Sequence, residues 1–364
     1  MRNSFRKAAC TVLGLVALVL VWGDARRALS YPGALPGAKR VEIKISAVGD
    51  VMFGRYGRRH RYRPFGMNQP FARVKKLLAG RDIVICNLET PISARRYRRP
   101  YRNLSFRAPP KAARMLKDAG FTLAATANNH AWDQGDRGVR DTIDHLKRAG
   151  VAHAGTGRTL AEAFRPWVFV KQGVRVGVLS VTMLRNYPVR ERVGFVAFVH
   201  YRRALKDLPG WVAKARRKLD FLVVSLHFGQ EYKLGVIRRE RRLMSLVHRA
   251  GADVVFGHHP HVLRPIERRK KFVVFYSLGN FLMDFRLKHT GLTGVAEVTL
   301  VKQGARRFID KVGFVPVWRH WKGLPRPAVG RYARLVRRLL YRYTRRMGVK
   351  NKWVRRGEGV EIQM

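Results

Sequence analysis

Three histidines within four residues form the group in this sequence with the clearest capacity for chemistry. They are His258, His259 and His261, and they directly follow a strand-like run at residues 252–256. Because alternate side chains of an extended chain share a face, His259 and His261 are expected to point the same way, with His258 opposite them as packing or support. Neutral imidazole is the commonest protein ligand for zinc, manganese or iron. The loop therefore predicts a metal site, and the alternative is a histidine-rich surface loop without one.

Other polar residues that suit a metal follow strand-like runs elsewhere in the chain. Asp50 follows residues 43–48, Glu89 follows 82–86, Asn129 and His130 follow 121–126, and His227 follows 221–226. Ligands of open α/β sheets bind outside the carboxyl ends of the strands, so these side chains are expected to meet the histidine loop at one rim. Each has an ordinary alternative: a turn cap for Asp50, an arginine pair for Glu89 and a hydrogen-bonded core position for His227.

The donor atoms of this group indicate which ions it suits. The predicted metal ligands are Asp50, Glu89, Asn129, His227, His259 and His261. They supply carboxylate and amide oxygens and imidazole nitrogens but no thiolate. This mixture suits two divalent ions such as Mn²⁺, Fe²⁺ or Zn²⁺ rather than a structural zinc. One carboxylate between two ions would bridge them at the ~3.5–4 Å spacing of two-metal hydrolases.

Apolar periodicity places these residues in an α/β fold. Helices are expected at residues 71–78, 111–119 and 138–149, and they alternate with the strand-like runs. Further strands are expected at residues 174–181, 253–256 and 272–276. Alternation of strands and helices indicates a layered α/β domain, and short continuous apolar runs are typical of strands that are covered on both faces.

The composition sets limits on partners rather than on fold. The 364 residues include 75 Lys and Arg against 23 Asp and Glu, which gives a formal net charge of +52. A field of this sign attracts polyanions such as nucleic acid, anionic lipid or an acidic polymer. The two cysteines, Cys10 and Cys86, lie in a leader and in a strand-like run, so no internal disulfide is expected.

The N-terminus has the layout of an export signal. Three basic residues precede an uncharged apolar run at residues 8–22, and this order is typical of such signals. Residues 1–30 are expected to be a cleaved signal or an uncleaved membrane anchor, with a buried N-terminal helix as the alternative, and residues 31–40 a linker. The protein is therefore expected to be exported, and to be membrane-anchored, periplasmic or extracellular.

The C-terminal residues 319–364 form a basic extension beyond the main domain at residues 41–318. Residues 319–357 contain no acidic residue, and apolar residues recur at helical spacing between Val329 and Met347, with arginines between them. Such a basic amphipathic helix either packs its apolar stripe on the domain or binds anionic lipid or an acidic polymer. Nucleic acid is not expected as a partner, because export would keep the protein away from it and the sequence has no nucleic-acid-binding motif.

Six short blocks of the sequence resemble those of a known family. They are residues 47–52, 87–91, 127–135, 227–232, 257–261 and 276–281, in this order along the chain. Together they resemble the CapA-type bacterial capsule-synthesis proteins, also called poly-γ-glutamate biosynthesis proteins, which look like a branch of the calcineurin-like metallophosphoesterases. The resemblance extends over residues 41–317. It implies a four-layer α/β/β/α sandwich of the calcineurin-like metallophosphatase type, with a dinuclear metal site.

The resemblance also implies a role for each candidate metal ligand. Asp50 would hold the first metal, Glu89 would bridge the two, Asn129 and His227 would hold the second, and His259 and His261 would divide between them.

The resemblance also implies two catalytic residues, and the sequence differs from the superfamily pattern at two positions. His130 would face the substrate as proton donor, and Asp133 would orient His130. Met52 stands where the superfamily usually has a first-metal histidine, and Glu89 stands where it usually has an aspartate.

Two classes of function fit these expectations. In the first, the protein is a metal-dependent hydrolase or transferase-like enzyme at the cell surface that acts on a phosphoryl or amide centre. In the second, it is a non-catalytic part of an envelope assembly or export complex and binds an acidic chain through its charge. The expected partners are poly-γ-glutamate or another anionic polymer, the membrane surface and other capsule-synthesis membrane proteins.

Overall fold

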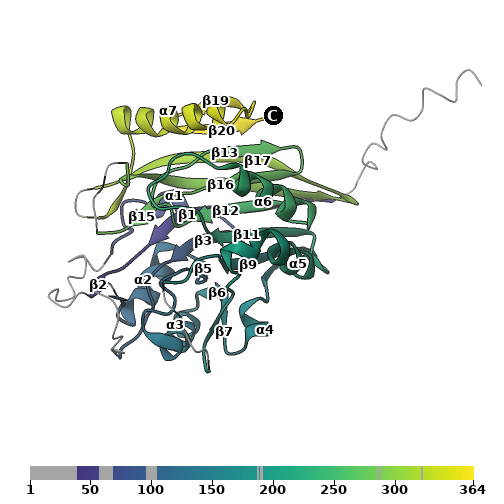
Figure 1. Cartoon of the computed structure of the whole chain (residues 1–364). Coiled ribbons are helices and arrows are strands. Elements are labelled where there is room, and N and C mark those ends of the chain that lie inside the picture. The colour runs from purple at the N-terminus through teal and green to yellow at the C-terminus, as the bar shows by residue number, and fades with distance from the viewer. Residues whose placement is uncertain are drawn as a thin grey trace, which may run out of the picture. The chain divides into compact units, whose positions relative to one another are not determined.

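Two mixed β-sheets form the framework of the part of the chain that the computed structural model describes (Figure 1). The described residues are 39–364 apart from 57–68, 96–104, 187, 189–191, 285–286, 288 and 321–322. The expected signal or anchor and most of the linker lie outside them. Residues Arg40–Met364 form one compact unit, to which the C-terminal extension also belongs. None of the described helices is long and apolar enough to span a bilayer.

The first sheet has ten strands and combines a parallel half with an antiparallel half. The parallel strands are β1 (Arg40–Val51), β3 (Ile83–Leu88), β5 (Leu123–Ala125) and β6 (Ala152–Ala154). The antiparallel half adds β16 (Leu292–Gln303), β17 (Arg306–Arg319), β20 (Gly359–Gln363) and β19 (Lys352–Arg356), in that order from β1. Two short strands pair beside this path, β15 (Asn280–Leu282) with β1 and β18 (Pro325–Pro327) with β17. The ends of β1, β3 and β5 therefore share one edge.

The second sheet has six strands, and its four central strands are parallel. In spatial order they are β14 (Phe272–Phe275), β12 (Val254–His258), β11 (Phe221–His227) and β9 (Val174–Thr182). Antiparallel strands close both edges, β13 (Ile266–Arg269) beside β14 and β8 (Trp167–Lys171) beside β9. Two small ribbons lie apart, β2 (Arg55–Tyr56) with β4 (Ser105–Phe106) and β7 (Thr156–Gly157) with β10 (Phe195–Val196).

The hydrophobic clusters show how the layers stack. Side chains from both sheets, such as Ile45 and Ile85 of the first and Val223 and Phe256 of the second, form one buried cluster between the sheets. Helices α1 (Lys75–Leu78) and α2 (Lys111–Ala119) cover the outer face of the first sheet. Helices α5 (Ala204–Arg216) and α6 (Arg238–Arg249) cover the outer face of the second. The expected four-layer α/β/β/α sandwich is therefore confirmed.

The remaining helices differ in how well the sequence predicted them. They are α3 (Gly135–Arg148), the short α4 (Leu160–Ala163), the 3₁₀ helix η1 (Tyr201–Arg203) and α7 (Gly330–Arg346). The expected helix at residues 71–78 is helical only in α1. The preceding residues close short turns instead, with bonds from Val74 N to Phe71 O and from Leu77 N to Val74 O. Turns closed by bonds between residues three apart bury Phe71 and Val74, as a helix would. The spacing of apolar residues alone therefore could not distinguish these turns from a helix.

Helix α7 packs its apolar stripe onto the rest of the unit. Val336 and Leu340 are fully buried in the cluster between the sheets, and Tyr332 stacks on Trp318 of β17 with ring centroids 4.3 Å apart. Figure 1 shows the helix beside β19 and β20. Of the two alternatives for this stripe, packing holds, so only the opposite face of the helix is available to a partner.

Candidate metal centre

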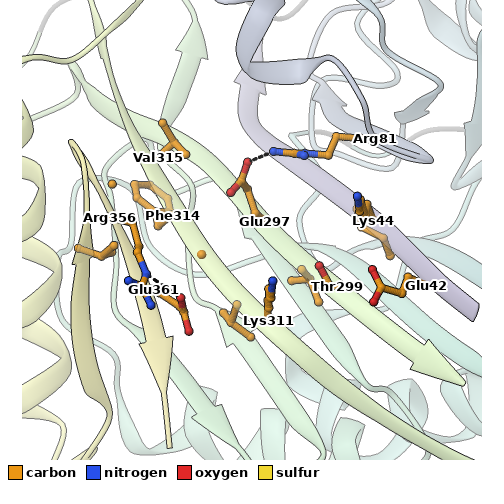
Figure 2. Close-up of a pocket in the computed structure, with 16 residues that line it drawn as sticks. Glu42, Lys44, Arg81, Glu297, Thr299, Lys311, Phe314, Val315, Arg356 and Glu361 are labelled. Atoms are coloured by element: carbon orange, nitrogen blue, oxygen red, sulfur yellow. Dashed lines mark hydrogen bonds and ion pairs between the residues drawn. The ribbon is translucent and has the colours of Figure 1, made fainter. Parts of the chain in front are cut away.

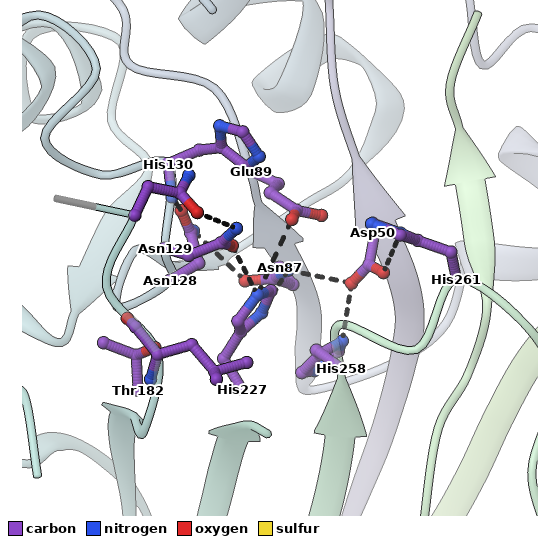
Figure 3. A network of polar contacts seen from close by, with 12 residues as sticks. Asp50, Asn87, Glu89, Asn128, Asn129, His130, Thr182, His227, His258 and His261 are labelled. Carbon is purple, nitrogen blue, oxygen red and sulfur yellow. Dashed lines mark hydrogen bonds and ion pairs between the residues drawn. The ribbon is translucent and has the colours of Figure 1, made fainter. Parts of the chain in front are cut away.

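The carboxyl ends of strands from both sheets bring the predicted ligands together (Figure 3). Parallel register sets Asp50 of β1 beside Asn87 of β3, and His227 of β11 beside His258 of β12. Glu89 follows β3 directly, and its backbone N–H bonds to the Val51 carbonyl. The continuous apolar strands therefore fix the backbone on which the polar side chains stand.

Three overlapping sets of side chains offer ligand atoms that lie within 4.8 Å of one another. They are Asp50, Glu89 and His261; Glu89, His227 and His259; and Glu231, His259 and His261. The structure thus brings together five of the six predicted ligands and adds Glu231. The sixth, Asn129, places its Oδ1 2.8 Å from His227 Nε2, while its Nδ2 donates to Asn186. Buried clusters of this composition are compatible with a metal site.

Glu89 is the residue that most needs a cation. Its side chain is fully buried, and neither carboxylate oxygen has a hydrogen-bond partner among the described residues. The nearest imidazole nitrogen, His227 Nε2, is 3.6 Å away. Burying a carboxylate without compensation costs several kcal/mol, and a divalent ion beside Glu89 would remove that cost. The residues present therefore fit a bound metal.

Electrostatics at the centre favour the neutral form of two imidazoles, those of His227 and His259. Burial, followed by the positive charge of neighbouring His261, lowers the pKa of His259 to about 3. Burial and then the His259 charge hold the pKa of His227 well below its ordinary value. Metal ligands must be deprotonated, so both rings are in the form that binds metal at neutral pH.

The two carboxyl groups respond in opposite directions. Burial and then the Asp50 charge hold the pKa of Glu89 well above its usual range. Burial acts the same way on Asp50, but hydrogen bonds from His258 and His261 outweigh it and hold the pKa of Asp50 well below normal. For His261, burial is outweighed by Glu89 and Asp50, which raise its pKa to about 9. A cation between the carboxylates would relieve the repulsion that Glu89 experiences.

The histidine loop reaches the centre by a different route from the expected one. His259 and His261 have positive backbone φ angles of 95° and 60°, so the loop is not extended and strand alternation does not apply. Their ring centroids nevertheless lie 5.8 Å apart, and both rings offer ligand atoms to one set. Left-handed backbone costs a non-glycine residue on the order of 1–3 kcal/mol and gathers at functional sites. The expected convergence is present, but its reason is a pair of left-handed turns.

Asparagine side chains hold the candidate ligands in place, and sequence reasoning overlooked most of them. Asn87 Nδ2 donates to Asp50 Oδ1 at 2.8 Å, Asn128 Nδ2 donates to the Leu88 carbonyl at 2.8 Å, and His261 Nδ1 donates to Asn280 Oδ1 at 2.8 Å. Such partners fix ligand orientation. In the sequence these three asparagines are marked only by their location, because each lies inside one of the blocks that carry the family resemblance.

His258 and the pair His130–Asp133 lie around the ligand sets. His258 Nδ1 is 3.3 Å from Asp50 Oδ1, a supporting contact of the kind expected for it. His130 Nδ1 lies 2.7 Å from Asp133 Oδ2, and the ring stacks on Phe106 with centroids 4.0 Å apart. Asp133 Oδ2 also accepts from the Phe106 N–H at 2.7 Å. The imidazole of His130 is therefore held on one edge and one face.

A cavity elsewhere in the unit has a different character. It has a volume of about 430 Å³ and opens over β1, β16, β17 and β20 (Figure 2). Two ion pairs lie in its lining, Arg81 with Glu297 and Arg356 with Glu361 at 3.0 Å. The lining contains no histidine. The cavity therefore lacks the imidazole nitrogens that the candidate metal centre offers.

Comparisons with known proteins identify the family. The model of the family "Bacterial capsule synthesis protein PGA_cap" matches residues 44–285. The chain is 32% identical over 272 residues to the "PGA biosynthesis protein CapA" of Bacillus subtilis (strain 168), covering 73% of this chain and 70% of that protein. It is 30% identical over 291 residues to the "Capsule biosynthesis protein CapA" of Bacillus anthracis, covering 75% and 67%. A crystal structure of a 5'-nucleotidase from Candida albicans SC5314 aligns with a TM-score of 0.43 at 10% identity, over 86% of this chain and 59% of the nucleotidase. With two thirds of its length matched by the family model, this chain belongs to the PGA_cap family of bacterial capsule synthesis proteins.

Proposed function

We propose that this protein is a metal-dependent hydrolase of the cell envelope that acts in the synthesis or export of an anionic capsule polymer, poly-γ-glutamate or a similar chain. The observation that carries the proposal is the buried carboxylate of Glu89, which lies beside Asp50 and His259 and has no hydrogen-bond partner among the described residues. Family membership supports the capsule polymer, and the net charge of +52 supports an acidic one. The charged and then apolar layout before residue 23 supports an exported, membrane-anchored or periplasmic protein. Family membership supports other capsule-synthesis membrane proteins as partners.

The centre is proposed to hold two divalent ions, Mn²⁺, Fe²⁺ or Zn²⁺, with Glu89 between them. Asp50, Glu89 and His261 would hold one ion, and Glu89, His227, His259 and the Asn129 carbonyl would hold the other. Bound ions supply positive charge at a phosphoryl or amide oxygen of the substrate and help to ionise water.

His130 is proposed to give a proton to the leaving group. Asp133 contacts Nδ1 and Phe106 supports one ring face, which leaves the Nε2 edge of the ring for the substrate. His130 belongs to none of the three ligand sets among the described residues. Proton donation from such a position typically contributes ~10²–10⁴-fold to rate.

The test is metal analysis combined with turnover by the purified full-length chain. The original protein should bind two ions and hydrolyse a model phosphodiester or a γ-glutamyl amide. His130→Ala should keep both ions and lose turnover. The control His145→Ala, on the α3 surface, should keep both ions and its turnover. A protein that binds no divalent ion under any condition would refute the proposal.

A second candidate function is a non-catalytic, polymer-binding component of an assembly complex. The observation in its favour is Met52, which is fully buried with Phe106 and Met283 where the superfamily usually has a metal-binding histidine. This second candidate function predicts that the protein binds metal and supports capsule formation but turns over none of the model substrates.

We also propose that the outward face of α7 binds the acidic polymer. Arg331, Arg334, Arg338, Arg342 and Arg345 are all exposed on this helix. Exposed positive charges that lie on one face attract a polyanion. Salt screens this attraction, and at ~0.1 M salt charges more than about 10 Å apart interact little. Leu335 and Tyr341 are about half exposed on the same helix, so an anionic membrane surface is the alternative partner.

Substitution of these five arginines separates the partners without removing the buried stripe of α7. The five-glutamine variant should lose most of its retention on immobilised poly-γ-glutamate, and a five-lysine variant should keep it. Retention should fall as salt rises. Equal retention of the glutamine variant would place polymer binding elsewhere, and loss of binding to anionic vesicles alone would assign this face to lipid.

A further inference from the structure

The first strand of the fold contributes one metal ligand where the resemblance implies two. The side chain of Met52 is fully buried with Phe106 and Met283, and its backbone N–H donates to the Leu282 carbonyl at 2.7 Å. A thioether is a soft ligand that suits Cu(I) rather than Mn²⁺. Within the described residues, the set around Asp50 therefore has three protein ligands instead of four.

A carboxylate approaches the same ligands from the second sheet. Glu231 offers an oxygen within 4.8 Å of ligand atoms of His259 and His261. His261 also belongs to the set of Asp50 and Glu89, so Glu231 adjoins the set that lacks a ligand. Glu231 is exposed, whereas the two histidines are buried, so Glu231 lies on the solvent side of this set.

Backbone bonds keep the loop that carries Glu231 against the histidine loop. After β11, Phe228 N donates to the His258 carbonyl at 3.1 Å and Tyr232 N donates to the Pro260 carbonyl at 2.9 Å. The Tyr232 ring lies 6.0 Å from that of His261. Glu231 is thus placed beside the histidines by its own backbone and not by side-chain flexibility alone.

A buried ion pair supports this loop from below. Arg264 donates two hydrogen bonds to Glu240, at 3.0 and 2.6 Å, and both side chains are buried. A Cβ atom at Gly229 would lie 2.9 Å from Arg264 Nη1 and 3.0 Å from Glu240 Oε1, and Gly229 has a φ of +99°. Only glycine lets the loop approach the pair so closely, which holds the start of the loop rigid.

We propose that Glu231 is a metal ligand that replaces the imidazole missing at position 52 and completes the coordination of the ion on the His261 side. A second observation points the same way: His259 is 7% exposed, and its Nδ1 has no hydrogen-bond partner among the described residues. The inference rests on the proposed metal-dependent function. A carboxylate in place of an imidazole shifts the donor atoms towards oxygen, which suits Mn²⁺ better than Zn²⁺.

The test is Mn²⁺ titration of the metal-free full-length protein by calorimetry, with Mn²⁺ counted by elemental analysis. Glu231→Gln should bind one of two ions at least about tenfold more weakly, because losing even a supporting partner of a ligand costs ~10–100-fold. Glu231→Asp keeps a carboxylate and should retain both ions. Asp118→Asn removes an exposed carboxylate on α2 that pairs with Arg114, and should titrate like the original chain.

The outcomes distinguish this inference from the function on which it rests. If the original protein binds two Mn²⁺ and Glu231→Gln binds them with unchanged affinity, Glu231 is not a ligand and the inference fails alone. If the original protein binds no Mn²⁺, the proposed function fails as well. Because Glu231 is exposed, its metal-free variants should melt within about 2 °C of the original chain, as expected for surface substitutions. Weaker Mn²⁺ binding by Glu231→Gln, together with unchanged binding by Glu231→Asp, then shows that the Glu231 carboxylate is a metal ligand.

Discussion

Replacement of Glu89 by glutamine should separate the cost of a buried carboxylate from its use as a metal ligand. The two side chains have nearly the same size, so the packing around β3 is preserved. In the metal-free protein, burial and the Asp50 charge act against ionised Glu89 and raise its pKa well above normal. An uncompensated buried charge costs several kcal/mol. The metal-free variant should therefore be at least as stable as the original chain.

Metal should reverse this order. An ion that binds only the folded state adds ~2.7 kcal/mol of stability when free metal is ~100 times its Kd. Glu89 belongs to two of the three ligand sets, so two ions would give the original chain about 5 kcal/mol that the variant lacks. At ~2–4 °C per kcal/mol, the original chain should gain about 10–20 °C in melting temperature. His227 belongs to one set only, so His227→Gln should keep about half of the gain.

The assay is thermal unfolding followed by circular dichroism, in EDTA and in excess MnCl₂, for the three proteins side by side. The refuting result is a Glu89→Gln protein that keeps the full rise in melting temperature with Mn²⁺. A metal-free variant several kcal/mol less stable than the original would also refute the reasoning, since it would mean that the carboxylate already has a stabilising partner.

Three further predictions concern the scaffold. Burial raises the pKa of Asp253 to about 7. Because this pKa lies above the unfolded value, the free energy of unfolding should fall by on the order of 4 kcal/mol as pH rises from ~4 to ~7. In urea titrations across this pH range, the free energy of unfolding of Asp253→Asn should depend less on pH. Glu240→Gln should cost about 3–5 kcal/mol in the same titrations because it leaves the buried Arg264 charge unpaired, and a Glu240→Leu, Arg264→Met double variant that is no more stable than Glu240→Gln would contradict this. A Cβ atom at Gly49 would lie 1.9 Å from the Gly279 carbonyl oxygen, so Gly49→Ala should displace β15 from β1 beside Asp50; unchanged Mn²⁺ affinity in calorimetry would show that the strands yield without harm.

The central strands and the candidate ligands could be predicted because both depend on local composition. The runs at β3, β11 and β12 are apolar on both faces, since helices cover one side and the other sheet covers the other. The hairpin of β16 and β17 was not predicted. Its later residues alternate between buried and half-buried positions, and this pattern is weaker in sequence than a continuous run.

Residues that act through long-range partners were the ones that sequence reasoning missed. Asn280 and Asn87 belong to a residue type that is common in turns, so nothing local marks them as partners of His261 and Asp50. His259 and His261 have left-handed backbone, and the loop after β11 donates hydrogen bonds to the carbonyls of the adjacent His258 and Pro260. Such features are set by tertiary contacts, which composition and spacing do not contain.

The position of the last strands has a consequence for how the chain must fold. β1 pairs with β16 from Arg40↔Gln303 onward, and β20 pairs with β17 only near the end of the chain. Contacts of such long sequence separation slow folding, because the loop-closure entropy is lost before the pairing is gained. The buried cluster between the sheets also includes Val336 and Leu340 of α7, which follow both sheets' central strands in the sequence. A growing or translocating chain should therefore remain incompletely folded until α7 and β20 have emerged, and a stop codon placed after β17 should yield a protein that chaperones hold or proteases degrade rather than a shortened version of this one.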